Sequence, residues 1–182
     1  MSGCAAVVSA IMAFATWTFS QEISRPAPAL EDMSVECIQV DSHTLDIKLK
    51  FTFRNVGKQF LEIADLGAGK VDFRTNTYQQ LAFKPVLNPI GPNCKFLYSA
   101  PYTLTTKEEI ADPKAYLKTL PAKGIQQCIV VRIAYKEPTL FCSRTRVAKY
   151  FLLYDGSTLN LLEQEKYQKI GSYLPAEYKL SK

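Results

Sequence analysis

The sequence predicts a mainly β fold: an antiparallel two-sheet sandwich with one or two short inserted helices and a C-terminal helix. Three observations support this class. One stretch alternates strictly between apolar and polar residues, further extended runs are separated by Gly, Pro and Asn, and no regular helical crossovers join the runs. The ten Tyr and ten Phe also favour strands and bury large areas.

The clearest strand runs from Leu45 to Arg54. Its apolar side chains are Leu45, Ile47, Leu49, Phe51 and Phe53, with Asp, Lys or Thr between them. A period of two predicts one buried and one solvent-facing side, as in an antiparallel sheet. We expect Asn55-Val56-Gly57 to end this strand, because Asn and Gly tolerate positive φ.

The other expected strands are bounded by turn residues such as Gly67, Gly69 and Asn88-Pro89. They cover residues 35–40, 59–66, 70–75, 95–104, 125–135 and 143–154. Thr106 and Glu109 have the spacing of a capping box, and Asp112-Pro113 is typical of an N-cap followed by the first helical residue. Short helices are therefore expected after Thr106 and after Asp112.

The first twenty residues contain no Lys, Arg, Asp or Glu. Their apolar run, Ala5 to Phe19, is about 15 residues long, which fits the core of a signal peptide better than the ~20 residues of a spanning helix. Ala13-Phe14-Ala15 has the form of a cleavage site, although no positively charged residue precedes the run. We expect residues 1–20 to be a signal peptide or a membrane anchor.

The rest of the chain divides into three parts on this interpretation. Residues 21–32 form a linker, residues 33–156 the β-sandwich domain, and residues 157–182 a C-terminal helix and tail. The helix is expected because Leu159, Leu162, Lys166 and Ile170 share one helical side. The body is then exported, to the periplasm or the extracellular space. The alternative is a membrane-anchored domain facing outward, with residues 4–19 in contact with the membrane.

The stretch from Leu49 to Gly57, LKFTFRNVG, resembles a segment of immunoglobulin-like β-sandwich domains of bacterial envelope proteins, in which an alternating strand ends in an N-x-G turn. The resemblance covers about nine residues. The body has no Trp to pack on a central disulfide, since Trp17 precedes it, so the antibody-type branch is not expected. The resemblance implies a sandwich that is used for binding or assembly.

The body carries four cysteines: Cys37, Cys94, Cys128 and Cys142. An even number of cysteines outside the cytoplasm predicts two disulfides, with three possible connectivities. The competing interpretation is four buried free thiols. No pair has C-x-x-C spacing and His43 is the only histidine, so we predict no metal site and no cofactor.

No sequence motif of catalysis is present. A G-x-S-x-G elbow, a P-loop, a dinucleotide fingerprint and an H-E-x-x-H motif are all missing from the sequence. No catalytic residue is predicted, and the chain is interpreted as a non-enzyme. The alternative is an envelope hydrolase that uses scattered carboxylates or Cys142 together with His43. The competing interpretation of His43 is an exposed histidine of a turn.

The candidate binding surface is a basic strip on the expected hairpin that ends the sandwich. It consists of Arg132, Lys136, Arg144, Arg146 and Lys149, with Tyr135 and Tyr150 nearby. Such a strip would meet a protein partner or an anionic envelope surface. The competing interpretation is a strand edge that its charges protect against unwanted pairing. The formal net charge of +5 is too dispersed for a dedicated nucleic-acid binder, so no nucleic acid is expected.

These observations favour an exported, non-catalytic binding or assembly module of the cell envelope. Its contact surface would be an exposed sheet edge or the basic hairpin, through strand addition or charge complementarity. The alternatives are the envelope hydrolase and a membrane-anchored accessory subunit.

Overall fold

The computed structural model describes residues 12, 25–72, 75, 77–85, 88–120, 127–138, 142–154, 158–162 and 174–178. The strands are β1 (Pro28–Asp41), β2 (Thr44–Asn55), β3 (Glu62–Asp72), β4 (Thr77–Pro85), β5 (Lys95–Thr105), β6 (Gln127–Pro138), β7 (Ser143–Tyr154) and β8 (Leu159–Leu161). The helix α2 spans Pro113–Thr119, and a 3-10 turn, η1, spans Ala176–Tyr178. The predicted mainly β fold is confirmed.

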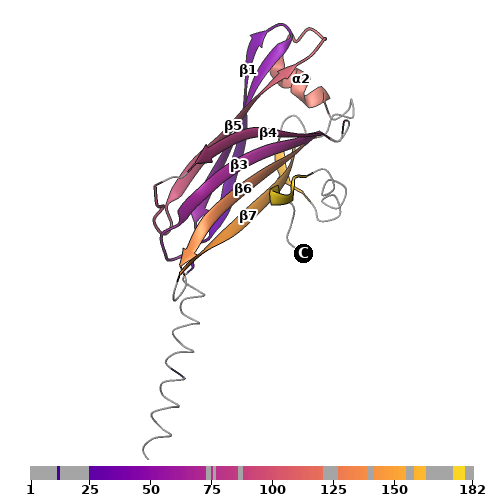
Figure 1. Cartoon of the computed structure of the whole chain (residues 1–182). Helices are drawn as coiled ribbons and strands as arrows, with labels where there is room; N and C mark the ends of the chain where they lie inside the picture. The colour runs from indigo at the N-terminus through magenta and orange to yellow at the C-terminus, as the bar shows by residue number, and fades with distance from the viewer. Residues whose placement is uncertain are drawn as a thin grey trace, which may run out of the picture.

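The strands form two antiparallel sheets that pack face to face (Figure 1). One has three strands in the order β1-β2-β5, and the other has five in the order β4-β3-β6-β7-β8. β1 and β5 are the edges of the smaller sheet. The prediction of a two-sheet antiparallel sandwich is confirmed, while the finer immunoglobulin-like assignment remains a resemblance.

The main core fills the space between the sheets. Alternation in β2 holds along its whole length, because Leu45, Leu49, Phe51 and Phe53 are 0% exposed. Aromatic rings extend this core across the sandwich: the ring centroids of Phe53 and Tyr150, from opposite sheets, are 5.3 Å apart. Burial of this apolar face is the main stabilising term of the fold.

β3 is one continuous strand where the sequence predicts two. Gly67 and Gly69 were expected to separate strands at 59–66 and 70–75, but both lie inside β3. Gly69 is required there because the Tyr78 ring lies over it: a Cβ at Gly69 would be 2.3 Å from Tyr78 Cε2. Tyr78 belongs to β4, a strand that the sequence analysis did not identify.

The upper end of the molecule, as drawn in Figure 1, is the β1–β2 turn with α2 beside it. Asp112 caps α2 as predicted, since its Oδ1 accepts from Lys114 N at 2.9 Å. The helix expected after Thr106 does not form. The Thr106 hydroxyl instead accepts a hydrogen bond from Glu108 N at 3.2 Å in a turn, and Thr106 N donates to His43 O at 2.9 Å. This segment therefore packs against the β1–β2 turn.

The prediction of a C-terminal helix is wrong for its first residues. Residues 159–161 form β8, which pairs with β7, and Leu159 is buried in the main core. Leu174 and Tyr178 belong to a second apolar cluster, with Cys128 and Val130, on the outer face of the five-stranded sheet. The remainder of the predicted helix, residues 163–173, lies outside the described residues.

The lower end, named as in Figure 1, consists of residues 55–61, residues 88–95 and the ends of β6 and β7 at Pro138 and Ser143. Leu61 and Ile90 exchange two backbone hydrogen bonds there, 2.8 and 2.9 Å long. β1 begins at Pro28, inside the predicted linker of residues 21–32. The predicted signal peptide or anchor lies outside the described residues except for Met12.

Candidate functional site

The structure divides the predicted basic strip between two faces of one sheet. Residues directly opposite in an antiparallel pair point to the same side, and successive residues of a strand alternate. Arg132 is opposite Lys149 on the outer face, which Lys136 shares. Tyr135 is opposite Arg146 on the inner face. The inner group also contains Arg144, opposite Glu137, and Tyr150, opposite Val131.

Most of these side chains have structural partners. Arg132 pairs with Asp65, and Lys136 Nζ lies 2.6 Å from Glu62 Oε1, so the outer cations are matched by β3 carboxylates. Tyr150 is an inter-sheet residue: its hydroxyl donates to Pro28 O at 2.6 Å, and burial raises its pKa to about 12. The interpretation of this hairpin as a charge-protected structural element fits these contacts better than a continuous anion-binding strip.

Glu137 is the most buried carboxylate of the described residues, with its side chain 6% exposed. Arg146 Nε donates to its Oε2 at 2.6 Å, and Arg25 Nε lies 2.9 Å from Oε1. The bond to Glu137 raises the pKa of Arg146 above its usual value. This triad ties the start of the described chain to the β6–β7 hairpin.

Asn55 organises the lower end through its side chain. It is 0% exposed, and its Oδ1 accepts from Ala27 N at 3.3 Å and from Gly57 N at 3.1 Å. Its Nδ2 donates to the carbonyls of Gln59, Ile90 and Gly91 at 2.7, 3.1 and 3.3 Å. One amide therefore joins the N-terminal segment to both turns of the lower end.

The N-x-G turn works differently from the prediction. Among described non-glycine residues only Asn93 has positive φ, at 58°, and Asn55 remains in β2. Gly57 is needed for close approach, because a Cβ there would be 1.9 Å from Arg25 O. The requirement for Asn and Gly is thus one of hydrogen bonding and space.

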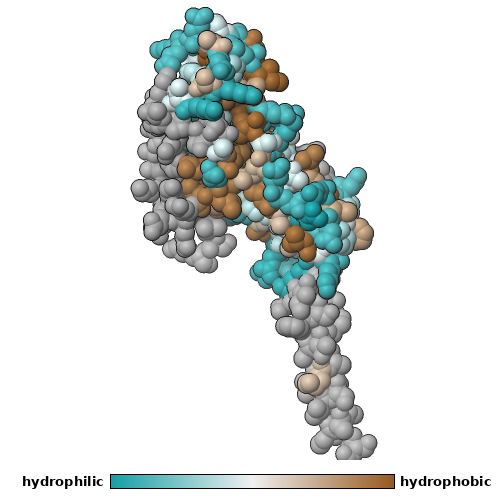
Figure 2. Space-filling view, turned by 180° about the vertical axis from the view of Figure 1, so that it is seen from behind, coloured by the Kyte–Doolittle hydropathy of each residue, from teal (hydrophilic) through white to brown (hydrophobic). Residues whose placement is uncertain are grey.

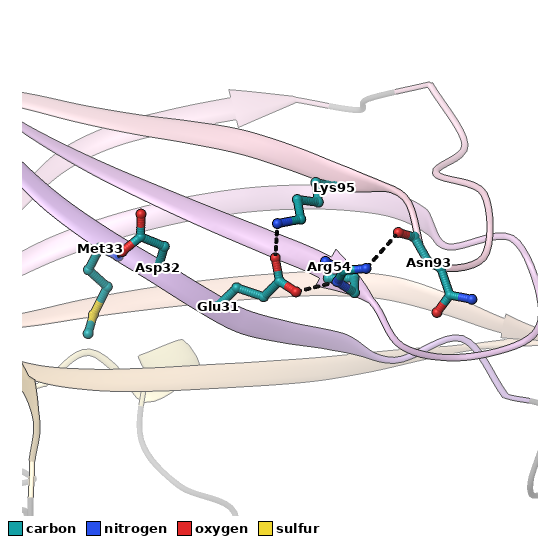
Figure 3. Close-up of polar contacts among 6 residues, drawn as sticks. All are labelled: Glu31, Asp32, Met33, Arg54, Asn93 and Lys95. Carbon is teal, nitrogen blue, oxygen red and sulfur yellow. Dashed lines mark hydrogen bonds and ion pairs between the residues drawn. The ribbon is translucent and has the colours of Figure 1, made fainter.

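A second charged cluster crosses the outer face of the smaller sheet (Figure 3). Glu31 on β1 pairs with Arg54 on β2 and, at 2.8 Å, with Lys95 Nζ on β5. Arg54 Nη1 also donates to Asn93 O at 3.4 Å. The hydrogen bonds from Arg54 and Lys95 lower the pKa of Glu31, so this carboxylate stays ionised further into the acid range.

The lower end also carries exposed apolar side chains, in addition to its charged groups. Phe60 is 66% exposed and Val56 is 54% exposed. Beside Phe60 is a hollow of about 410 Å³ lined by Phe60, Glu62, Pro89, Lys136, Pro138 and Ser143. The exposed ring and the hollow together make this part of the lower end a candidate contact surface.

The upper end has a comparable surface on β1. Ile38 is 67% exposed and Val40 is 57% exposed. A hollow of about 400 Å³ adjoins Ile38, lined also by Asp46, Ile47, Lys48, Pro101, Tyr102 and Thr103. Figure 2 shows hydrophobic surface among hydrophilic groups toward both ends of the sandwich.

Lys70 is a charged residue of the space between the sheets. Its Nζ lies 4.4 Å from the centroid of the Tyr102 ring, and Tyr102 Oη donates to buried Gln127 Oε1 at 3.2 Å. Burial lowers the pKa of Lys70 and raises that of Tyr102. The cation–π contact joins the two sheets near the upper end.

The predicted disulfides do not form between the described cysteines. Cys37 is opposite Ile47, whereas Cys94 O accepts from Asn55 N. Ile47 and Asn55 are eight residues apart in β2, about 26 Å at the rise of a strand. A disulfide requires Cα atoms within about 7 Å, so Cys37 and Cys94 cannot pair in this fold.

Cys128 and Cys142 are separated in the same way. Cys128 is opposite Leu153, near the end of β7, whereas Pro138, at the other end of β6, is opposite Ser143. Cys142 directly precedes Ser143, so the length of β7 lies between them. Cys128 is buried, which raises its pKa to about 12, while Cys94 and Cys142 are exposed.

The structure does not bring His43 and Cys142 together. His43 lies in the β1–β2 turn at the upper end, where its Nδ1 is 3.1 Å from Glu108 O. Cys142 lies at the lower end. Twelve residues of β2, about 36 Å, span the distance between these ends. Among the described ranges, no three His, Cys, Asp or Glu residues are arranged to hold a metal ion.

Sequence reasoning missed Phe60, Ile38 and Glu137. For the first two a signal was available: Phe60 has the same parity as Glu62, and Ile38 the same parity as Glu36, so both are apolar residues on a predicted solvent side. No sequence signal indicated the role of Glu137, because its partner Arg25 is remote in sequence.

Comparisons with known proteins leave the family unassigned. No protein-family model matches the chain, and no curated protein matches it. Three similar solved structures are a protein from Archaeoglobus fulgidus, a protein from Bordetella pertussis described as ApaA, and a β-glucuronidase from Bacteroides uniformis.

All three likenesses are remote. The Archaeoglobus protein has 14% identity and a TM-score of 0.36 over 74% of this chain and 100% of its own. The Bordetella protein has 9% identity and a TM-score of 0.47 over 71% of this chain and 94% of its own. The β-glucuronidase has 9% identity and a TM-score of 0.35, over 67% of this chain and only 13% of its own. At these scores the likenesses carry no argument about function.

Proposed function

We propose that this chain is an exported binding or assembly module of the cell envelope, which acts by contact and not by catalysis. The observation that supports the proposal is the edge strand β1 at the upper end. Among the described strands, β1 is the outermost of its sheet, and it carries the exposed side chains of Ile38 and Val40. An apolar, unpaired strand edge is suited to adding a strand from a protein partner.

The experiment uses a photo-crosslinking residue in place of Ile38, in the full chain and in its native host. We expect a crosslink to one defined envelope protein. The crosslink should be lost when Val40→Lys puts a charge on the edge. A matched control is Leu97→Lys, because Leu97 is 70% exposed on the other edge strand of the same sheet.

Two results would contradict the proposal. One is fractionation of the intact chain with the cytosol. The other is a crosslinking pattern that Val40→Lys and Leu97→Lys change equally. The hydrolase alternative predicts instead that His43→Ala abolishes a measurable turnover while the fold persists.

The membrane-anchored accessory subunit is the second candidate. It is favoured by the fixed position of Arg25 at the lower end, which would set the orientation of an anchored domain. No helix in the described part of the chain has the length and apolar character to cross a bilayer, and the apolar run of residues 5–19 lies outside that part apart from Met12. The mass of the native protein separates the two: loss of 15–20 N-terminal residues indicates cleavage.

A further inference from the structure

We propose that the lower end of the sandwich lies against the surface of a lipid bilayer. Val56 and Phe60 would enter the interface, and Lys58 and Arg144 would lie near anionic headgroups. This inference rests on the proposed envelope location and adds an orientation: the lower end faces the membrane and the upper end, with Ile38, faces away from it.

The chain leaves the described body at this end. Arg25 is held by Glu137 at 2.9 Å, and its carbonyl packs on Gly57, where no Cβ fits. Val56 N donates to Ala27 O at 2.9 Å, and this bond holds the segment that follows Arg25 against the residues that follow β2. The first described residues of the body are therefore built into the lower end.

The sequence places the apolar run close to this attachment. Only residues 20–24 separate Phe19 from Arg25, and a fully extended chain of this length spans about 20 Å. If residues 5–19 lie in a bilayer, the lower end is within that distance of the membrane surface. The upper end is further away by about the 36 Å length of β2.

The side chains of the lower end suit an interface. Phe60 and Val56 are exposed on either side of exposed Lys58, so two apolar groups flank a cation on one turn. Aromatic and aliphatic groups next to Lys or Arg are the usual composition of segments that lie at the headgroup level. A purely aqueous surface gains nothing from exposing a phenyl ring to this extent.

The charge of this end is complementary to an anionic surface. This end carries three carboxylates, Glu31, Glu62 and Glu137, and seven cations: Arg25, Arg54, Lys58, Lys95, Lys136, Arg144 and Arg146. The carboxylates are used in ion pairs with five of the cations. Lys58 and Arg144 have no ion-pair partner among the described residues, and both are exposed. They are the two positions at which lipid phosphates would bind.

The experiment measures the depth of one indole in the full chain reconstituted with vesicles of phosphatidylcholine and 30% phosphatidylglycerol. Phe60→Trp is made in a Trp17→Phe background, which leaves a single Trp. Ile38→Trp in the same background is the matched control, because Ile38 and Phe60 are 67% and 66% exposed at opposite ends. Circular dichroism checks that both variants fold.

With lipids brominated near the headgroup, we expect at least twofold quenching and a blue-shifted emission for Phe60→Trp, and neither effect for Ile38→Trp. Lys58→Glu together with Arg144→Glu should reduce the quenching, whereas Lys48→Glu, a cation near the upper end, should not. Replacing phosphatidylglycerol with phosphatidylcholine should have the effect of the double substitution.

Three outcomes would overturn the inference: a chain that does not float with vesicles, a floating chain whose Phe60→Trp variant is not quenched, and equal quenching of both variants. None of these affects the crosslink at Ile38, which tests the proposed function separately. Conversely, quenching of the Phe60→Trp variant without any crosslink at Ile38 would support the proposed membrane orientation. It would contradict the proposed partner surface on β1.

Discussion

At the scale of single residues, Asn55 makes the largest number of side-chain contacts with the backbone at the lower end. Its amide has two acceptor contacts and three donor contacts, all with main-chain groups. Because the residue is fully buried, water cannot replace those partners once the side chain is removed. The cost of losing it is then the desolvation of several main-chain groups as well as the loss of the bonds themselves.

We therefore expect Asn55→Ala to lower the free energy of unfolding by about 3 kcal/mol. Asn55→Asp should cost at least as much, because it removes the Nδ2 donor and sets a carboxylate against three carbonyl oxygens. Asn93→Gly is the control: Asn93 has φ of 58°, which Gly adopts freely, so its effect should stay within about 0.5 kcal/mol. Urea unfolding measures the free energy of unfolding of all three variants. A small loss of stability in Asn55→Asp would contradict the assignment of Nδ2 as a donor to three backbone carbonyls.

The residue scale also shows how far sequence reasoning extends. Alternation correctly placed the five apolar side chains of β2 in the core, because period and burial are local properties of one strand. The residues of the basic strip lie on two faces for a related reason. Side-chain direction depends on the register of the two strands, which a list of nearby basic residues does not include. In the observed register Arg132 is opposite Lys149 and Arg144 is opposite Glu137, so Arg132 and Arg144 point to opposite faces.

At the scale of elements, β3 and β4 depend on one close contact. Gly67 and Gly69 suggested a break in the strand, since Gly is common in turns and weakens strands. The requirement for Gly69 comes from a ring in another strand, Tyr78, which also packs in a tilted arrangement on Tyr178 with centroids 5.4 Å apart. A sequence pattern cannot reveal that requirement, because it arises from tertiary packing of the C-terminal segment.

This contact predicts a coupled pair. Gly69→Ala should destabilise the protein by about 2 kcal/mol, because the new methyl overlaps the Tyr78 ring. In a Tyr78→Ala background the methyl has room, and the same substitution should cost little, which gives a coupling energy of about 1–2 kcal/mol. Urea unfolding of the two single variants and the double variant measures it. Additive effects would show that the ring does not lie over Gly69.

At the scale of the whole molecule, Glu137 links segments that are more than one hundred residues apart in sequence. It joins Arg25, which precedes β1, to Arg146 in β7, and so closes the lower end of the sandwich across both sheets. Its side chain is 6% exposed, whereas those of Arg25 and Arg146 are 39% and 41% exposed. The three charged groups therefore differ in their access to solvent. Either arginine can be hydrated when its ion pair is lost, but the carboxylate of Glu137 cannot.

This asymmetry predicts strongly non-additive substitutions. Arg25→Ala and Arg146→Ala should each cost about 1 kcal/mol, because the other arginine still neutralises Glu137. The double variant leaves a buried, unpaired carboxylate and should cost about 4 kcal/mol, well above the sum. Lys136→Ala is the control, since its pair with Glu62 is nearly half exposed on both sides and should contribute no more than about 0.5 kcal/mol. Additivity of the two arginine substitutions in urea unfolding would mean that Glu137 is hydrated, and that Arg25 is not fixed to the lower end.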